Sequence, residues 1–398
     1  MLELALRGNH RYWIWVTTLI VLTGSALAMF ILQYTEGLTV TAMSRVVPWG
    51  FYIAQLTFLV GVAASAVVVV LPYYLHDVRE FGKLTIFGEF LAIPAVIVAM
   101  LFVFVDVGQP QRILNIFLYP SPRSPMFWDS VALAGYLVLN LVIGWNALQA
   151  ERVGGEPPRW LKPLVYLAIP WAISIHTVTA FLYCGLAARP FWLTAVLTPR
   201  FLASAFAAGP ALLILLSLVM RRLTGFDPGD RALTKLAKIM AYAMVANVFL
   251  LVLELFTAFY SGSPEHIAPW VFLYWQVDGA MAPVVPFMWL SAVLAVASIV
   301  LIVRRRTYAE PVGLIPLAVM IIVSIWIDKG AGMMTGGLNP SPLGRLTHYF
   351  PSWVEIVMGV GLYALGALIL TVLYKIAVTV KQETASFPPD SPRPERSH

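Results

Sequence analysis

The chain alternates long apolar runs with short polar segments, and ten of the runs are long enough to cross a bilayer as helices. A hydrocarbon core about 30 Å thick takes about 20 helical residues. The eighth and ninth runs have the least regular boundaries, because Pro283 and Pro286 open the eighth and the ninth is short. The pattern predicts an all-α integral membrane protein with about ten transmembrane helices. The runs lie near residues 13–33, 49–75, 83–106, 126–147, 163–186, 200–220, 235–260, 281–303, 312–329 and 352–376.

Residues 1–381 form one predicted polytopic membrane domain, followed by a tail at residues 382–398. The tail is rich in Pro and Ser and lacks apolar periodicity, which predicts a disordered cytoplasmic segment. Two similar segments, Asp106-Val-Gly-Gln-Pro110 and Tyr260-Ser-Gly-Ser-Pro264, end the third and seventh runs. A parallel repeat of this kind favours two four-helix bundles plus two extra helices.

The composition excludes a water-soluble globule. Apolar residues make up 60% of the chain and charged residues 12%, against about 25% charged in soluble domains. The net charge of +6 does not indicate nucleic-acid binding, because the basic residues lie between apolar runs and form no basic stripe. The predicted surroundings of the chain are therefore the lipid bilayer, with no nucleic-acid partner.

The distribution of basic residues predicts the topology. With ten spans, 19 of the 26 Lys and Arg residues fall on the side of the two termini. By the positive-inside rule, both termini are expected in the cytoplasm and the longer, Gly- and Pro-rich loops on the outer face. The seven basic residues assigned to the outer side are Arg45, Arg112, Arg123, Arg189, Arg200, Lys329 and Arg345.

Residue counts limit the cofactors that the chain can hold. A single cysteine, Cys184, cannot supply the four thiolates of an iron–sulfur cluster. Of the six histidines only His176 lies well inside a span, whereas a transmembrane b-type haem takes two. We therefore expect neither haem nor cluster, and no bound metal. Any redox function then requires a diffusible carrier such as a quinone, together with a partner's cofactor.

Six ionisable residues lie within or at the ends of the spans, where each costs roughly 2.5–3.5 kcal/mol on insertion scales. Several carry alternative interpretations. The three at the outer interface, Asp106, Asp328 and Glu355, are as compatible with solvated helix ends or loop salt bridges as with a functional role. Glu254 shares a helix face with Asn247 and can form a hydrogen bond inside the bundle, and His176 can bond a neighbouring carbonyl. The six are Glu89, Asp106, His176, Glu254, Asp328 and Glu355.

An ordered set of motifs over almost the whole chain resembles the NrfD, or polysulfide reductase membrane subunit (PsrC), family. Ten spans, the Ala-Phe-Ala-Ala-Gly209-Pro segment and Ile-Asp328-Lys329-Gly330 are most similar to DsrP of the DsrMKJOP sulfur-metabolism complex, with the HybB and HmeB type second. The motifs are Pro48-Trp49-Gly50, Asp106-Val-Gly-Gln-Pro-Gln-Arg112, Ser174-Ile-His176-Thr177, Pro190-Phe-Trp192, Asn339-Pro-Ser-Pro342 and Tyr349-Phe-Pro-Ser-Trp353-Val-Glu355.

The resemblance implies a haem-free quinone/quinol oxidoreductase subunit that is active only within a complex, in the cytoplasmic membrane of a bacterium or archaeon. Such a subunit binds menaquinone or ubiquinone near the periplasmic face. It exchanges electrons with a docked periplasmic iron–sulfur subunit of the four-cluster, ferredoxin-like type. Cytochrome and further membrane subunits of a DsrMKJOP-like complex are the other expected partners.

Quinol oxidation releases two electrons and two protons, so its site needs proton acceptors, an apolar slot and a wet exit. We expect Asp106 and His176 to accept the protons and Arg112 to hold Asp106 ionised or to clamp a quinone carbonyl. Trp49 and Tyr52 are placed beside the ring. Trp192 is assigned either to the outer mouth of the site or to an interfacial aromatic belt.

Glu89, Asn247 and Glu254, together with His176, form a predicted proton relay from the quinone site inward. Two other functions stay open. A secondary transporter or channel also carries broken helices and intramembrane charges, although here the acidic residues cluster toward the outer face. A purely structural anchor for a redox partner leaves Glu254 and His176 without a role.

Overall fold

The computed structural model describes residues 1–277, 279–308 and 310–385. Within these residues, ten helical segments are long and apolar enough to cross a membrane, which confirms the predicted all-α membrane fold. The long helices are α1 (His10–Glu36), α2 (Phe51–Ala63), α3 (Ser65–His76), α4 (Thr85–Asp106), α6 (Pro125–Val153), α7 (Leu161–Cys184), α8 (Leu197–Thr224), α9 (Asp230–Ser261), α11 (Val285–Val303), α12 (Leu314–Ile325) and α14 (Trp353–Ala385).

Short elements complete the chain. The helices α5 (Asn115–Leu118) and α10 (Pro264–Tyr274) lie in connections, and α13 (Met333–Leu338) continues α12 through a π-helical turn at Trp326–Gly332. The strands β1 (Gln276–Val277) and β2 (Ala280–Met281) form one antiparallel hairpin. Single 3-10 turns lie at Leu2–Leu6, Gly37–Val40, Arg79–Lys83, Pro110–Arg112, Arg305–Tyr308 and Pro311–Gly313.

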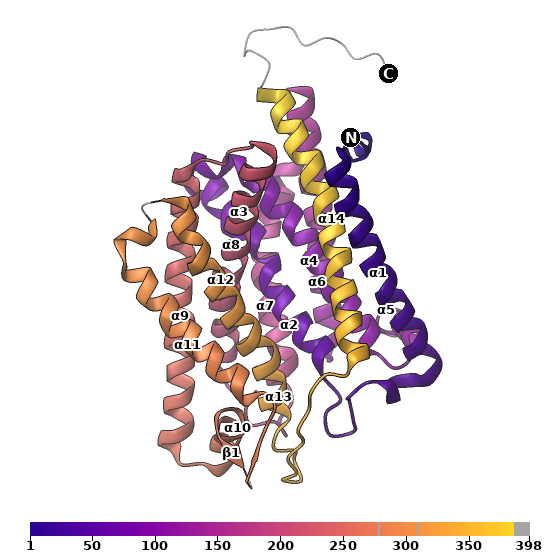
Figure 1. Cartoon of the computed structure of the whole chain (residues 1–398), viewed down its shortest axis with the longest axis vertical. Coiled ribbons are helices and arrows are strands. Elements are labelled where there is room, and N and C mark those ends of the chain that lie inside the picture. The colour runs from indigo at the N-terminus through magenta and orange to yellow at the C-terminus, as the bar shows by residue number, and fades with distance from the viewer. Residues whose placement is uncertain (278, 309, 386–398) are drawn as a thin grey trace.

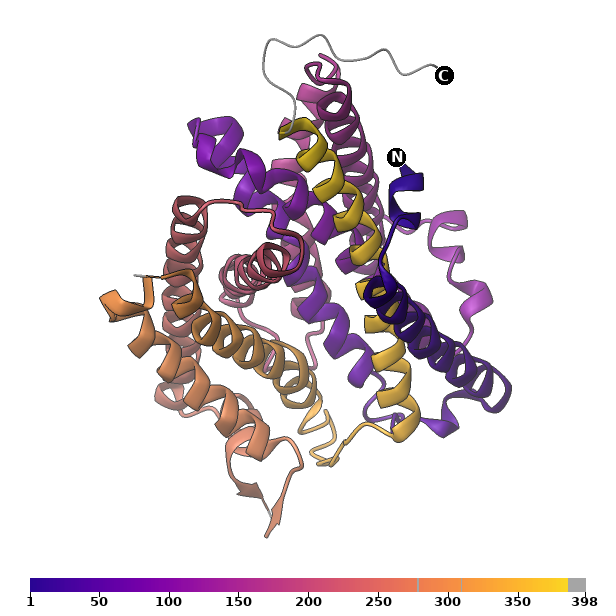
Figure 2. The ribbon, with the colours of Figure 1, turned by 45° about the horizontal axis from the view of Figure 1, so that its top comes forward.

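The helices form two bundles with a flanking pair. In the first bundle α2 and α3 pack on α4, α4 on α6, and α6 on α7; in the second α8 packs on α9 and α12, and α11 on α12. The long helices α1 and α14 pair with each other, and α14 packs on α4. Figure 2 shows α1 on the opposite side of the molecule from the orange α11. This arrangement has the predicted two four-helix bundles and two extra helices.

The two ends of the molecule differ in character. The N-terminal turn and the last turns of α14 lie at one end, here called the terminal end (Figure 1). The connections at residues 41–50, 107–124, 262–277, 279–284 and 339–352 lie at the other, here called the loop end. Which end faces the cytoplasm stays a prediction from the charge distribution.

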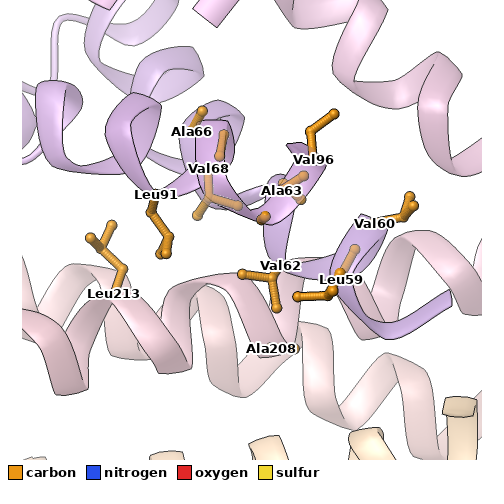
Figure 3. Packing of buried hydrophobic residues seen from close by; sticks show 14 of the residues in the cluster. Leu59, Val60, Val62, Ala63, Ala66, Val68, Leu91, Val96, Ala208 and Leu213 are labelled. Atoms are coloured by element: carbon orange, nitrogen blue, oxygen red, sulfur yellow. The ribbon is translucent and has the colours of Figure 1, made fainter. Parts of the chain in front are cut away.

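The run predicted at residues 49–75 is the centre of the fold. It breaks at Ala64 into α2 and α3, and every residue from 52 to 70 is buried. Gly209 of α8 allows a close approach at the break, because a Cβ there would lie 3.0 Å from the Ser65 nitrogen. Figure 3 shows buried side chains of the central run, among them Val62 and Ala63, together with Leu91 and Val96 of α4 and Ala208 of α8. Small side chains therefore let neighbouring helices contact the central one closely.

The ninth span differs from its predicted end at residue 329, because the helical path continues to Leu338. The sequence Gly330-Ala-Gly-Met-Met-Thr-Gly-Gly337 looks like a loop, yet these glycines serve packing. A Cβ on Gly337 would lie 1.8 Å from Cε2 of Trp192, and one on Gly332 would lie 2.5 Å from Sδ of Met288. Asp328 therefore lies inside the span rather than at the outer interface, where the sequence placed it.

One boundary at the C-terminal side also differs from prediction. The helix α14 continues through Ala385, so residues 382–385 belong to it and not to the predicted tail. The rest of the predicted tail, residues 386–398, lies outside the described residues.

Candidate functional site

A cavity of about 680 Å³ opens between α2, α4 and α6 at the loop end, and we call it the α4 cavity. Its walls are mainly aliphatic and aromatic, with a few polar groups, which is the usual make-up of a small-molecule site. Of the five predicted quinone-site residues, Trp49, Asp106 and Arg112 line this cavity. Tyr52 and His176 are not on its wall.

Asp106 is the last residue of α4 and one of the few polar residues that line the cavity. Its Oδ1 is buried and has no hydrogen-bond partner among the described residues. A buried acceptor without a donor costs about 1–3 kcal/mol, so a hydrogen-bond donor that reaches Oδ1 from the cavity would be favoured. Arg112 is exposed, and within the described residues its guanidinium forms no ion pair with Asp106.

Tyr52 lies behind the cavity rather than in it. Its hydroxyl is fully buried and donates to Oε1 of Gln33 at 2.8 Å, while Nε2 of Gln33 donates to the Val105 carbonyl at 2.6 Å. These bonds connect α1, α2 and the last turn of α4. Tyr52 thus positions the turn that carries Asp106.

Trp49 belongs to an aromatic cluster with Tyr183 and Trp192. The ring centroids of Trp49 and Tyr183 lie 5.6 Å apart, and those of Trp49 and Trp192 lie 5.8 Å apart. Trp192 is fully buried, and its Nε1 donates to the Met333 carbonyl at 3.0 Å. The interfacial-belt alternative for Trp192 is therefore wrong.

Asp129 is a cavity residue that sequence reasoning missed. It lines the α4 cavity, and its Oδ1 accepts from Oγ1 of Thr179 at 2.6 Å. His176 precedes Thr179 by about one helical turn on α7, is fully buried, and has no hydrogen-bond partner at either ring nitrogen within the described chain. An acidic residue four positions into the run at 126–147 was the available signal for Asp129. The bond between Thr179 and Asp129 joins α7 to α6 at the cavity, whereas His176 does not line it.

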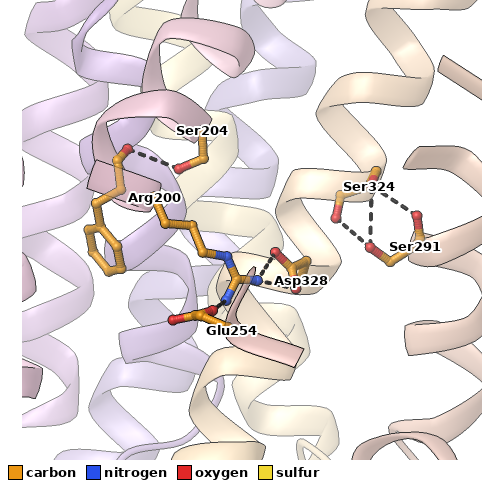
Figure 4. Close-up of polar contacts among 7 residues, drawn as sticks. Arg200, Ser204, Glu254, Ser291, Ser324 and Asp328 are labelled. Atoms are coloured by element: carbon orange, nitrogen blue, oxygen red, sulfur yellow. Dashed lines mark hydrogen bonds and ion pairs between the residues drawn. The ribbon is translucent and has the colours of Figure 1, made fainter. Parts of the chain in front are cut away.

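A second polar centre lies between α8, α9 and the π-helical turn. Arg200 donates through Nη1 to Glu254, and through Nη2 to both oxygens of Asp328, at 2.8 Å and 2.6 Å (Figure 4). The three side chains are between 8% and 12% exposed. The sequence placed Arg200 at the outer start of the run at 200–220 and Asp328 at the outer interface. The structure instead makes both of them partners within a buried ion-pair network that includes Glu254.

Lys329 joins this centre from the same π-helical turn. Its Nζ donates to the Phe201 carbonyl at 3.4 Å and lies 4.2 Å from the centroid of the Phe201 ring. A void of about 10 Å³ is lined by Arg200, Lys329 and Asn247, whose Oδ1 has no described partner. We call Arg200, Glu254, Asp328 and Lys329 the charge cluster. A void of this size is close to the minimum that holds one water molecule.

The predicted relay residues are divided between the two bundles. Asn247 and Glu254 both lie on α9 in the second bundle, Asn247 on the wall of the void and Glu254 paired with Arg200. Glu89 lies on α4 in the first bundle and lines a separate void of about 10 Å³ with Tyr136 and Asn140. The structure does not bring Glu89 together with the other two.

Glu355 is fully buried and organises the loop end. Its Oε2 accepts from the backbone nitrogens of Ala42 and Ser352, each at 2.8 Å, and its Oε1 accepts from the Tyr349 hydroxyl at 2.5 Å. Burial and the Glu355 charge raise the pKa of Tyr349, so its hydroxyl stays protonated and donates. Glu355 is thus a capping residue of α14 rather than a solvated helix end.

Within the described parts of the chain, no group of three or more His, Cys, Asp or Glu side chains is arranged to hold a metal ion.

Comparisons with known proteins show which family has this architecture. The family model "Polysulphide reductase, NrfD" matches residues 39–336. The chain is 26% identical over 90% of its length to a protein of Halobacterium salinarum named as a membrane subunit of dimethyl sulfoxide reductase, 89% of which is covered. It is 21% identical to the "Hdr-like menaquinol oxidoreductase integral membrane subunit" of Archaeoglobus fulgidus, with 94% of each chain covered.

Two further similarities extend these. A selenate reductase subunit of Mesobacillus selenatarsenatis is 20% identical, with 92% of this chain and 94% of that protein covered. Among solved structures, bd oxidase from Geobacillus thermodenitrificans has a similar fold, with a TM-score of 0.50 and 12% identity over 94% of this chain and 99% of that chain. The family match extends over most of the chain, including both bundles and Asp106, Arg200 and Glu254: the protein belongs to the NrfD family of polysulphide reductase membrane proteins.

Proposed function

We propose that this protein is the haem-free membrane subunit of a redox complex, and that it binds quinol in the α4 cavity. The observation that carries the proposal is the unpartnered, buried Oδ1 of Asp106 in the wall of a large apolar cavity. A quinol supplies two electrons and two hydroxyl protons, and its hydroxyl is the kind of donor that Oδ1 lacks. The menaquinol oxidoreductase named among the relatives supports a quinone as the substrate class.

The residues in and around the α4 cavity have different proposed roles in quinol binding and oxidation. Asp106 accepts a hydrogen bond and then a proton, because it is the acceptor that the cavity leaves free. Trp49 contributes a ring face, and Arg112 contributes a cation at the exposed rim, where it can reach a carbonyl oxygen. Tyr52 holds the last turn of α4 through Gln33. His176 is the proposed second acceptor, because both of its ring nitrogens are buried without a hydrogen-bond partner among the described residues.

The proposed electron partner is an iron–sulfur subunit of the four-cluster ferredoxin-like type, docked at the loop end. The α4 cavity opens at this end, and the loops there are the longest in the chain. The relatives are named as membrane subunits of reductases and oxidoreductases, which supports a multi-subunit assembly. Within the family we propose the DsrP type, with cytochrome and further membrane subunits, periplasmic loops and cytoplasmic termini.

We further propose that quinol oxidation is coupled to proton transfer through the second bundle. Arg200, Asp328 and Lys329 of the charge cluster line one void together with Asn247, whose Oδ1 has no described partner, and Glu254 is paired with Arg200. Its π-helical turn is a feature frequent at functional sites. Glu89 would serve a separate arm in the first bundle.

The charge cluster is also what favours the second candidate, a secondary transporter or channel, since buried charges mark ion pathways in carriers. One experiment separates the two. The protein is purified, extracted with organic solvent, and the extract is analysed for quinone. Recovery of quinone from the wild type, and of less quinone per chain from Asp106→Asn, supports the quinol site. Absence of quinone, together with ion flux through reconstituted vesicles, supports the transporter.

A further inference from the structure

A second cavity, of about 410 Å³, lies on the other face of α2, and we call it the inter-bundle pocket. Gly50, Phe51, Ala54 and Gln55 line it, whereas Trp49, Ile53 and Leu56 line the α4 cavity. At 100° per residue, these two sets occupy nearly opposite faces of one helix. The far walls come from α14 and from the π-helical turn of the second bundle. One helix therefore separates two cavities at the loop end.

Gln55 is the polar centre of the inter-bundle pocket. It is only 3% exposed, and its Oε1 accepts from Nε1 of Trp326 at 2.8 Å and from the Tyr363 hydroxyl at 2.7 Å. An indole N–H can only donate, so the atom facing Trp326 must be the amide oxygen. The two hydrogens of Nε2 then face elsewhere, and no described residue accepts them. Among the cavities described above, Gln55 lines the inter-bundle pocket alone, so this pocket is the open space beside its NH2 group.

The geometry fixes what Gln55 can recognise. Both acceptor positions of Oε1 are used by Trp326 and Tyr363, so the side chain offers donors and no acceptor. A carbonyl oxygen, which only accepts, satisfies it. A hydroxyl in the same place needs an acceptor for its own hydrogen, and Gln55 offers none because Oε1 already accepts from Trp326 and Tyr363. The pocket is therefore complementary to a carbonyl compound and less so to its reduced, hydroxylated form.

The rest of the lining describes the body of the ligand. No Lys, Arg, Asp or Glu lines the pocket in the described chain, which leaves no partner for a phosphate headgroup. Six aromatic side chains line it, among them Phe51, Trp326 and Tyr363, and flat rings of this kind suit a planar ligand. Val360 and Phe287 on the rim are 49% and 44% exposed, so the pocket can be reached from the lipid side.

From these observations we infer that the inter-bundle pocket is a second quinone site that prefers the oxidised form. Its ring lies among the aromatic side chains with a carbonyl on the Gln55 amide, and its isoprenoid tail leaves past Val360 into the bilayer. This inference rests on the proposed function in naming a quinone as the ligand. The two faces of α2 then carry sites of opposite preference, Asp106 for the hydroxyl donor and Gln55 for the carbonyl acceptor.

The test uses the full chain in nanodiscs without added quinone and measures equilibrium binding of decylubiquinone and of its dithionite-reduced form. Gln55→Met removes the donor with little change in shape. Val360→Trp closes the rim from the lipid side, and Val300→Trp, at a residue that is 48% exposed on α11, is the matched control. We expect two oxidised quinones per wild-type chain. Gln55→Met and Val360→Trp should weaken one of them by about tenfold, whereas Val300→Trp and Asp106→Asn should leave it unchanged.

The outcomes separate this inference from the function on which it rests. If a single quinone binds, sensitive to Asp106→Asn and insensitive to Val360→Trp, the proposed function stands and the second site is wrong. If a glycerolipid found by native mass spectrometry is displaced by Val360→Trp and no quinone is, the occupant is a lipid and the inference is overturned. If no quinone binds anywhere, the proposed function fails first. Equal binding of reduced and oxidised forms in the Asp106→Asn chain would contradict the redox preference.

Discussion

Nη2 of Arg200 on α8 donates to both carboxylate oxygens of Asp328, which lies 128 residues further along the chain in a π-helical turn. The same guanidinium donates through Nη1 to Glu254 on α9. One cation thus balances two carboxylates from two other elements of the second bundle. Removing it would leave both carboxylates buried without their partner.

We therefore predict that Arg200→Met destabilises the protein by about 3–5 kcal/mol, the usual cost of an uncompensated buried charge. Thermal unfolding in detergent measures the loss. Adding Asp328→Asn to Arg200→Met should restore part of the stability, because it removes one of the stranded charges. Arg79→Met, at a side chain that is 85% exposed, is the control and should change little. Equal melting temperatures for Arg200→Met and Arg79→Met would contradict the ion-pair role.

Asp106→Asn should abolish quinol-dependent reduction of the electron partner while the complex still assembles. The amide keeps the size of the carboxylate but cannot take up the hydroxyl proton. Turnover of the assembled complex with added quinol measures this. Asp77→Asn, with a side chain that is 78% exposed at the terminal end, serves as the control. Wild-type turnover in an assembled Asp106→Asn complex would refute the assignment.

Glu254→Gln should keep the fold and the bound quinone but slow turnover or remove proton coupling. The amide oxygen still accepts from Arg200, so the geometry survives, whereas the titrating carboxyl is gone. Turnover and proton release are measured together in liposomes that contain the whole complex. Glu156→Gln, in an exposed loop at the terminal end, is the control. If both rates equal those of the wild type, Glu254 is a structural partner of Arg200 and no relay residue.

Gly337→Ala should destabilise the fold by about 1–3 kcal/mol, because a Cβ at this position meets the Trp192 ring at 1.8 Å. Gly155→Ala is the matched control, since a Cβ there has nothing within 4 Å. Melting temperatures of the two variants make the comparison. A Gly337→Ala protein as stable as Gly155→Ala would show that α13 does not pack on Trp192 as described.

Reporters fused to either terminus should be active only on the cytoplasmic side. The prediction rests on the 19 basic residues that fall on the side of the termini in the ten-span assignment. Matched fusions with a reporter that folds only in the cytoplasm and one that is active only in the periplasm give the reading. If the periplasmic reporter is active at both termini, the orientation is the reverse of the prediction. If it is active at one terminus only, the number of spans is odd and the ten-span topology is wrong.

The sequence by itself determined the number and the nature of the spans. Apolar run length is a local property, and a helix in a bilayer satisfies its own backbone hydrogen bonds, so ten runs predict ten spans without knowledge of their neighbours. The same reasoning identified Glu254 and His176 as buried polar residues, because an ionisable side chain inside a span costs free energy and therefore indicates a structural or functional role. It could also place Asp106 and Arg112 in one loop motif, since they are close along the chain.

The tertiary structure alone decided which residues meet. Arg200 finds Glu254 and Asp328 across 54 and 128 residues, and Glu355 finds Ala42 across 313, distances over which no local pattern carries information. The glycines of Gly330–Gly337 are typical of a loop, yet they lie in a helical segment. They are small because Trp192 and Met288 occupy the space that larger side chains at Gly337 and Gly332 would need. The two faces of α2 are both buried and equally apolar, so only the arrangement of helices around it creates the α4 cavity on one face and the inter-bundle pocket on the other.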